Sequence, residues 1–191
     1  MPEQLFLPGL ATPARDSLFF AVLPDRFAAH RARNIAENLR RARGLTGRPL
    51  GVRRFHVSLH GLGAYAGVPN DVVARARAAA AMVTDAPFEI AFDRATSFAG
   101  RRPQLPLVLC GPRSVDPLFA LHGTLGAALA RTGFARVSRR FTPHMTLLYD
   151  TRRLAPCSVE PVTWTAREFV LIHSRIGLTQ HIPLGRWSLE R

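Results

Sequence analysis

The chain has 191 residues and a formal net charge of +13, and all 26 of its basic residues are arginine. Its length suits one domain with a substantial core, and an apolar fraction of 47% favours a folded globular protein over a disordered one. The charge would attract phosphate-bearing polymers, but charge alone is weak support for a nucleic-acid function. Two cysteines, Cys110 and Cys157, exclude a disulfide framework and have no metal-ligand spacing, so we expect reduced thiols.

The N-terminal segment lacks the pattern of a targeting signal. Residues 1–16 contain Glu3, Pro8 and Pro13 but no basic start followed by an apolar run, so we interpret them as an irregular arm. No later segment approaches the roughly 18 apolar residues that a membrane-spanning helix needs. We therefore predict a cytoplasmic protein without a membrane partner, in which residues 17–191 form one domain.

The first half of the chain alternates strands with amphipathic helices. Residues 17–23 are an apolar run that ends at a proline, which is typical of a buried strand. Over 25–43 the apolar positions recur at helical spacing, with arginines on the other face. A strand follows at 53–60 and a glycine-rich turn at 61–63, and then a second helix that Asn70 would cap.

The second half is richer in strands. The remaining predicted strands are residues 88–92, 105–110, 141–149, 169–176 and 182–189. We expect a loop over 96–106, and a third helix that opens at Asp116 and Pro117 and ends at Gly133. No glycine-rich phosphate loop follows a strand, so an α+β protein with antiparallel sheets fits better than a parallel nucleotide-binding fold.

One short pattern occurs in both halves of the chain. His56 and Ser58 in the first copy, like His144 and Thr146 in the second, are separated and flanked by apolar residues or proline. Because side chains alternate along a strand, each copy would bury its apolar residues and present an imidazole and a hydroxyl on the other face. Two such strands could direct both pairs at one substrate. The repeat suggests two lobes, each with a sheet that carries one histidine strand and a helix outside it.

With these motifs the sequence resembles the two-histidine phosphoesterase superfamily, and within it the 2′-5′ RNA ligase-like RNA 2′,3′-cyclic phosphodiesterases. The similar segments are 18–24, 55–63, 143–147 and 183–189, so the resemblance extends over nearly the whole chain. It implies a bilobal duplicated fold in which two antiparallel sheets flank a central cleft, with helices on the outside. It also implies phosphodiester chemistry without a metal or other cofactor. Because the duplication would build the whole site from one chain, we expect a monomer without an obligate protein partner.

The paired residues suit the opening of a cyclic phosphate. A base must take a proton from water and an acid must protonate the departing ribose oxygen, and imidazole serves either role near neutral pH. Ser58 and Thr146 would donate hydrogen bonds to the non-bridging phosphate oxygens. In the scheme that the resemblance implies, His144 activates water and His56 protonates the 3′ oxygen, although the roles are exchangeable. The expected substrates are RNA ends or small cyclic nucleotides, with joining or cleavage of 2′-5′ linkages as a further activity.

Two positions depart from the family's pattern. Ser58 stands where threonine is more common, which keeps the hydroxyl. Leu148 and Tyr149 stand where many relatives have an alanine and an arginine that can approach the phosphate. The alternative sources of that positive charge are Arg54, Arg139 and Arg140.

Several further side chains are candidates for the cleft. His60 would share a strand face with His56, and Phe98 and Tyr149 could stack on a base. The substrate-binding candidates are therefore Arg54, His60, Phe98, Arg140 and Tyr149, each of which also has a structural alternative. On the last two predicted strands, a packing role and a cleft role both stay open for His173 and His181.

Two other classes of function remain compatible with the sequence. One is a catalytically silent nucleotide- or RNA-binding protein of the same fold, which the intact pairs of histidine and hydroxyl argue against. The other is a non-specific basic RNA-binding protein, which would show strongly salt-dependent affinity and no turnover.

Overall fold

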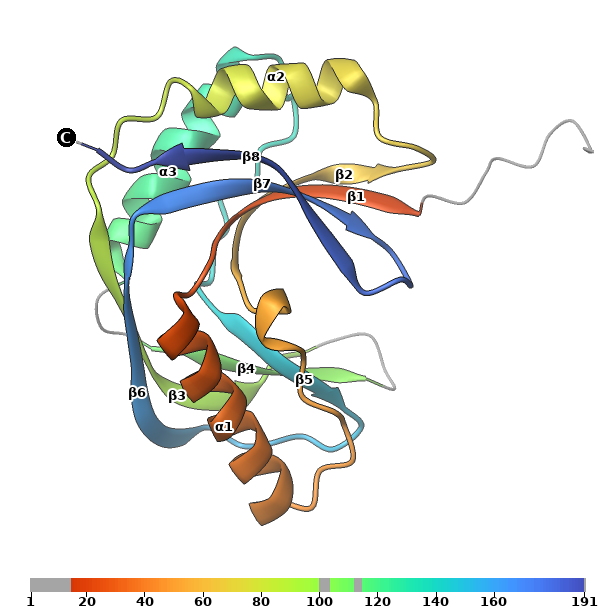
Figure 1. The fold of residues 1–191 in the computed structure, drawn as a ribbon, viewed down its shortest axis with the longest axis vertical. Helices are drawn as coiled ribbons and strands as arrows, with labels where there is room; N and C mark the ends of the chain where they lie inside the picture. Colours follow the sequence, from red (N-terminus) through yellow and green to blue (C-terminus); the bar gives the residue numbers. More distant parts are fainter. Residues whose placement is uncertain (1–14, 100–103, 112–114, 191) are drawn as a thin grey trace, which may run out of the picture.

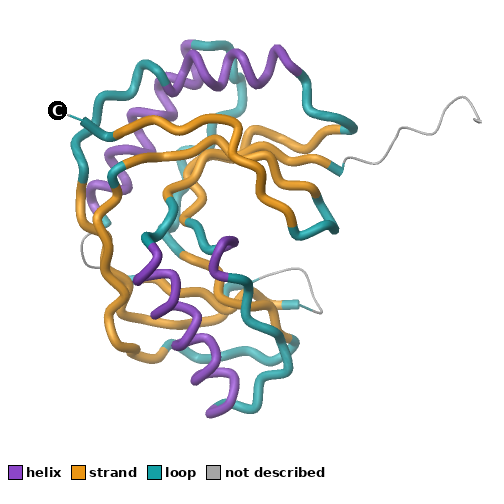
Figure 2. The backbone as a smooth tube through the Cα atoms, in the orientation of Figure 1, coloured by secondary structure: helices purple, strands orange, loops and turns teal. Residues whose placement is uncertain are grey.

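The structure is a computed structural model that describes residues 15–99, 104–111 and 115–190. Its elements in chain order are β1 (Asp16–Val22), α1 (Arg26–Ala42), the short 3-10 helix η1 (Val52–Arg54), β2 (Val57–Tyr65), α2 (Asn70–Ala80), β3 (Phe88–Ser97), β4 (Leu105–Cys110), α3 (Asp116–Arg131), β5 (Met145–Asp150), β6 (Cys157–Ala166), β7 (Glu168–Arg175) and β8 (Gln180–Ser188). Figures 1 and 2 show their arrangement. The predicted α+β class is confirmed.

The strands form one eight-stranded antiparallel sheet in the order β6-β3-β4-β5-β2-β1-β7-β8. In Figure 1 the half made of β1, β2, β7 and β8 lies above the half made of β3, β4, β5 and β6. The sequence predicted two separate sheets, and the structure differs because the two histidine strands, β2 and β5, pair with each other. That pairing consists of one residue pair, Val57 with Met145.

The helices lie on the outside of the two halves (Figure 1). α1 packs against β5 and β6, whereas α2 and α3 pack against each other and α3 contacts β2. The side chain of Asp25 caps α1 by accepting a hydrogen bond from the N–H of Ala28 at 2.8 Å. The buried face of α1 consists of small side chains, Ala28, Ala29, Ala32 and Ala36, so the helix can approach the sheet closely.

Several strands differ from the sequence-based prediction. η1 occupies the start of the strand predicted over 53–60, β3 runs beyond 92 to Ser97, and β5 begins at Met145 and not at 141. β6 was not predicted, because exposed residues interrupt its apolar positions and Pro161 lies in its middle. Proline is tolerated there because β6 is an edge strand, where a missing N–H breaks no ladder. β2 continues through the expected turn at 61–63, where Gly63 has φ +123°, a conformation that favours glycine.

Candidate active site

The two histidine strands meet at one buried pair of residues. Val57 of β2 lies opposite Met145 of β5, and both side chains are completely buried. Because side chains alternate along a strand, the residues on either side of this pair point to the other face of the sheet. Those residues are His56, Ser58, His144 and Thr146, of which Ser58 is exposed and the other three are partly buried. The structure therefore brings the four predicted side chains together on one face.

Both imidazoles are anchored in the same way. Nδ1 of His56 lies 2.8 Å from the carbonyl oxygen of Arg54, and Nδ1 of His144 lies 2.7 Å from the carbonyl oxygen of Thr142. A carbonyl oxygen can only accept a hydrogen bond, so Nδ1 donates in each ring. Nε2 is then the nitrogen that can exchange a proton with a ligand. In both motifs the accepting carbonyl thus belongs to the residue two positions before the histidine, so the repeated sequence motif has a repeated hydrogen bond.

Aromatic side chains from other strands surround the two histidines. The ring centroid of His56 lies 5.0 Å from that of Phe19 on β1 and 5.2 Å from that of His181 on β8. The ring of His144 lies 5.0 Å from Phe98, which directly follows β3. The candidate site is therefore built from both halves of the sheet.

The surroundings of His56 disfavour its charged form. Burial lowers its pKa, and the positive charges of His144 and Arg54 act in the same direction. The hydrogen bond to the carbonyl of Arg54 favours the charged form but is outweighed. His56 is therefore neutral at neutral pH and has a free lone pair on Nε2.

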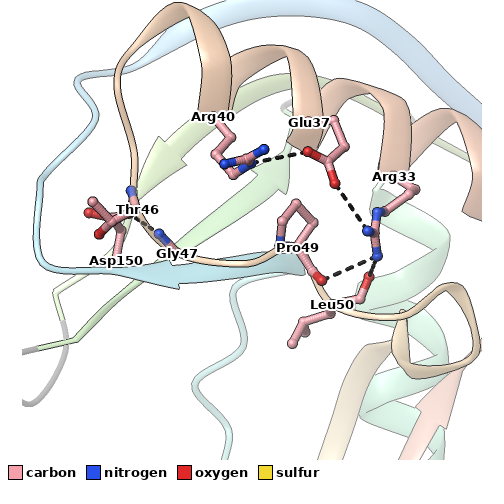
Figure 3. A network of polar contacts seen from close by, with 8 residues as sticks. All are labelled: Arg33, Glu37, Arg40, Thr46, Gly47, Pro49, Leu50 and Asp150. Atoms are coloured by element: carbon pink, nitrogen blue, oxygen red, sulfur yellow. Dashed lines mark hydrogen bonds and ion pairs between the residues drawn. The ribbon is translucent and has the colours of Figure 1, made fainter.

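A buried carboxylate fixes the segment that leads from α1 toward His56. Asp150, at the end of β5, accepts hydrogen bonds on Oδ2 from the N–H groups of Thr46 at 2.7 Å and Gly47 at 2.6 Å (Figure 3). Its Oδ1 accepts from the N–H of Arg152 at 2.8 Å. A Cβ on Gly47 would lie 2.0 Å from the carbonyl oxygen of Tyr149, so only glycine allows this approach.

An arginine of α1 holds the next part of the same segment. Nη1 of Arg33 donates to the carbonyl oxygens of Pro49 at 3.2 Å and Leu50 at 3.0 Å, and its Nη2 lies 3.0 Å from Glu37 (Figure 3). The N–H of Leu50 in turn donates to the carbonyl of Leu147 on β5 at 2.8 Å. The segment before η1 is thus tied to both α1 and β5, which fixes where His56 enters the site.

Of the three predicted arginines, Arg54 is the one whose charge acts on the pKa of His56, whereas Arg139 and Arg140 are exposed. The charge of Arg54 acts on the pKa of both His56 and His181, and its buried Nε has no hydrogen-bond partner in the described part of the chain. The backbone of Arg140 exchanges hydrogen bonds with the hydroxyl of Ser138. Arg54 is therefore the predicted source of positive charge that the structure places at the site.

The prediction that His60 shares a face with His56 is wrong. Consecutive residues of β1 pair with Ser58 and His60, so Leu59 is the extra residue of a β-bulge. An extra residue reverses the alternation of side chains beyond it. His60 consequently turns to the buried face, where Nε2 lies 2.8 Å from the carbonyl oxygen of His122 in α3 and the two rings stack at 3.9 Å.

A second bulge affects the position of Tyr149. Consecutive residues of β4 pair with Thr146 and Leu148, which leaves Leu147 as the extra residue. Tyr149 thereby returns to the face of Thr146, and the residue is 45% exposed. It stands on the histidine face, where the family pattern has an arginine.

Sequence reasoning missed Phe19 and left His181 open. Phe19 was read only as part of a buried run, although it is half-buried between the buried side chains of Leu18 and Phe20. All the residues of this run are apolar or small, so the sequence alone does not show which of them face the core and which face the site. In His173, the other open case, Nε2 lies 2.6 Å from the carboxylate of Asp16.

The described residues contain neither a metal-binding cluster nor a membrane-spanning helix. Across residues 15–99, 104–111 and 115–190, no group of three or more His, Cys, Asp or Glu side chains is arranged to hold a metal ion. None of the described helices is long and apolar enough to cross a membrane.

The fold is similar to that of several solved structures. TT0787 of Thermus thermophilus has a TM-score of 0.71 and 20% identity, covering 91% of this chain and 97% of that one. LigT of Escherichia coli, complexed with 3′-AMP, has a TM-score of 0.68 and 25% identity, covering 92% of this chain and 99% of that one.

Sequence comparison gives the same relationship. The chain is 28% identical over 150 residues to the RNA 2′,3′-cyclic phosphodiesterase of Escherichia coli (strain K12), covering 76% of this chain and 81% of that protein. The model of the 2′-5′ RNA ligase superfamily matches residues 24–175, which include both histidine motifs. The resemblance inferred from those motifs is confirmed, and the chain belongs to the 2′-5′ RNA ligase superfamily of two-histidine phosphoesterases.

Proposed function

We propose that this protein hydrolyses the 2′,3′-cyclic phosphates of RNA ends or nucleotides to 2′-phosphates without a metal ion. The observation that carries the proposal is the matched anchoring of His56 and His144 through Nδ1, on the same face of two paired strands. The name of the relative from Escherichia coli and the 3′-AMP complex of LigT support the same class of substrate.

The proposed reaction moves one proton at each imidazole. One Nε2 takes a proton from water as the water oxygen bonds to phosphorus. The P–O3′ bond breaks as the other imidazole, in its protonated form, gives its proton to the 3′ oxygen. Because the pKa of His56 is lowered, mainly by burial, we assign the base to His56 and the acid to His144. This reverses the assignment that the resemblance implies.

The remaining candidates would hold the substrate. Arg54, beside His56, would offset the charge of the phosphate, and Phe98, beside His144, would stack on the base. Tyr149, on the face of Thr146, would contact the nucleoside from the other side. For the exposed Arg140 we propose a weaker contact with the backbone of a longer RNA.

The two hydroxyls should contribute to kcat more than to binding. Donors aimed at charge that develops on phosphate oxygens stabilise the transition state, so Thr146→Val, or Ser58→Ala, should lower kcat by about 10²-fold. KM should change much less. Thr146→Ser retains the hydroxyl and is the matched control, which should recover most of the lost rate. A rate near that of the wild type in Thr146→Val, together with a loss in Thr146→Ser, would show that the methyl group of Thr146 matters and not its hydroxyl.

The proposed function is tested by turnover of a nucleoside 2′,3′-cyclic phosphate, with and without a chelator, followed by phosphorus NMR of the product. We expect a chelator-resistant reaction that yields only the 2′-phosphate. Accumulation of a 3′-phosphate would overturn the proposed regiochemistry, and complete inhibition by chelator would overturn metal independence. Salt-dependent RNA binding without turnover, on oligonucleotides as well as mononucleotides, would instead support the catalytically silent alternative.

Joining of RNA ends is the second activity to be tested at the same site. Attack by the 5′-hydroxyl of another RNA, in place of water, would break the same P–O3′ bond and form a 2′-5′ linkage. We propose that this reaction uses the same two histidines. RNA with a cyclic phosphate end, incubated with RNA that carries a 5′-hydroxyl, should then give a joined product that both histidine substitutions abolish.

A further inference from the structure

A third imidazole lies against His56. The rings of His56 and His181 are 5.2 Å apart at 77°, an edge-to-face contact, and the ring of Phe19 lies 5.6 Å from His181 and 5.0 Å from His56. The three rings therefore form a closed triangle, with the Nδ1 anchor of His56 to the Arg54 carbonyl as a further restraint. Among the residues that the structure describes, His144 has one ring partner, Phe98, so the two halves of the site differ at this point.

The hairpin of β7 and β8 delivers His181 to this position. His181 pairs with Ser174 on β7, and in Figure 1 the far end of the hairpin bends toward the lower half of the sheet. In the turn, Thr179 has φ 54°, which is rare for a β-branched residue. His181 follows two residues later, and its place is set by the ladder of β8 with β7.

His181 occupies this space without adding charge. Burial lowers its pKa to about 4, and repulsion from Arg54 and from the charged form of His56 acts in the same direction. The charges of His144 and Arg54 act on the pKa of His56. The neutral ring of His181 covers another side of the His56 ring and separates it from solvent there.

We propose that His181 is a positioning residue which, together with Phe19, fixes the ring of His56 and excludes water from one side of it. His181 acts through His56 rather than on the substrate. The effect on turnover rests on the proposed function, whereas the effect on the state of His56 does not.

If the ring at position 181 fixes His56 and excludes water from it, removing the ring and replacing it by another ring should have different effects. His181→Ala removes the ring and admits water, so the pKa of His56 should rise toward its ordinary value. Neutral His56 then becomes less abundant below about pH 6, and the acidic limb of kcat/KM should move to higher pH. His181→Phe keeps a ring of similar size in the same place, so it should restore the behaviour of His56.

NMR titration of the His56 imidazole in the two variants and the wild type tests the inference directly. We expect an upward shift for His181→Ala, none for His181→Phe, and none for the control Ile182→Ala. Ile182 neighbours His181 on β8 but is 39% exposed and was not placed in the site. The titration needs no turnover, so it stays informative if the proposed function fails.

The kinetic profiles supply the second readout. For His181→Ala, kcat/KM should fall several-fold more at pH 5.5 than at pH 8, with little change in KM. The inference is overturned if His56 titrates alike in His181→Ala and the wild type. It is also overturned if His181→Phe and His181→Ala raise KM equally at every pH, because His181 would then contact the substrate.

Discussion

Replacing either His56 or His144 by alanine should lower kcat for a nucleoside 2′,3′-cyclic phosphate by roughly 10²- to 10⁴-fold, because each change removes one of two proton-transfer groups. Both side chains face away from the buried pair Val57 and Met145, so the fold should survive. Steady-state kinetics measures the loss, and circular dichroism with thermal melting checks the fold. A variant that keeps a rate near that of the wild type would remove its histidine from the reaction.

A second substrate would distinguish which of His56 and His144 is the base and which is the acid. In a 3′-deoxynucleoside 2′-(4-nitrophenyl phosphate), the nitrophenolate leaves without needing a proton, and hydrolysis still gives a 2′-phosphate. His144→Ala should then recover much of its activity, whereas His56→Ala should stay inactive because water still needs a base. The opposite pattern would assign the base to His144, as the resemblance implies.

Asp150→Asn should cause the largest loss of stability among single polar substitutions at the scaffold of the site. The carboxylate accepts hydrogen bonds from three backbone N–H groups, of Thr46, Gly47 and Arg152, and an amide would turn its own donor toward at least one of them. Loss of charged, buried hydrogen bonds should reduce the free energy of unfolding by about 2–4 kcal/mol. Thermal melting should show a decrease in Tm of roughly 5–15 °C.

The pH dependence gives this prediction a further test. Burial alone would raise the pKa of Asp150, but the backbone hydrogen bonds outweigh it and hold the pKa below its ordinary value. Stability from a lowered carboxyl pKa is present above about pH 4 and is lost as pH falls through the folded-state value. The difference in the free energy of unfolding between Asp150→Asn and the wild type should therefore become smaller as the pH falls below about 4.

An exposed aspartate provides the matched control. Asp71 pairs with Arg75 on the surface of α2, with an exposed side-chain fraction of 73%. Asp71→Asn should change the free energy of unfolding by less than about 0.5 kcal/mol. Equal effects of the two substitutions would contradict the role given to Asp150.

The alternation of side chains in two short motifs was enough to predict the centre of the site. His-apolar-hydroxyl puts an imidazole and a hydroxyl on one face whatever the neighbouring strand, so His56 and Ser58 could be placed together from the sequence. The pairing of β2 with β5 could not, because a single residue pair leaves no pattern in the composition of either strand. The sequence therefore placed the four side chains on a common face correctly, but in a sheet that it divided into two.

Bulges limited the prediction further along the same strands. A bulge is defined by the register with the neighbouring strand. The bulges at Leu59 and Leu147 therefore become visible only when β2 is paired with β1 and β5 with β4, and the sequences of β2 and β5 do not reveal them. Strict alternation consequently placed His60 in the cleft, although it is buried beneath α3. His181 depended on a hairpin that brings the end of the chain to its beginning, a contact that short motifs do not encode.

The single pair between β2 and β5 lies at the centre of a much larger contact between the two halves. On both sides of it the strands are held by longer ladders, β1 with β2 and β4 with β5. Buried side chains of the two halves also belong to one hydrophobic core, which includes both Val57 and Met145. His56 and His144 each neighbour a residue of the pair. The packing of the core therefore sets the spacing of the two proton-transfer groups, and substitutions of Val57 or Met145 that change side-chain volume should alter it.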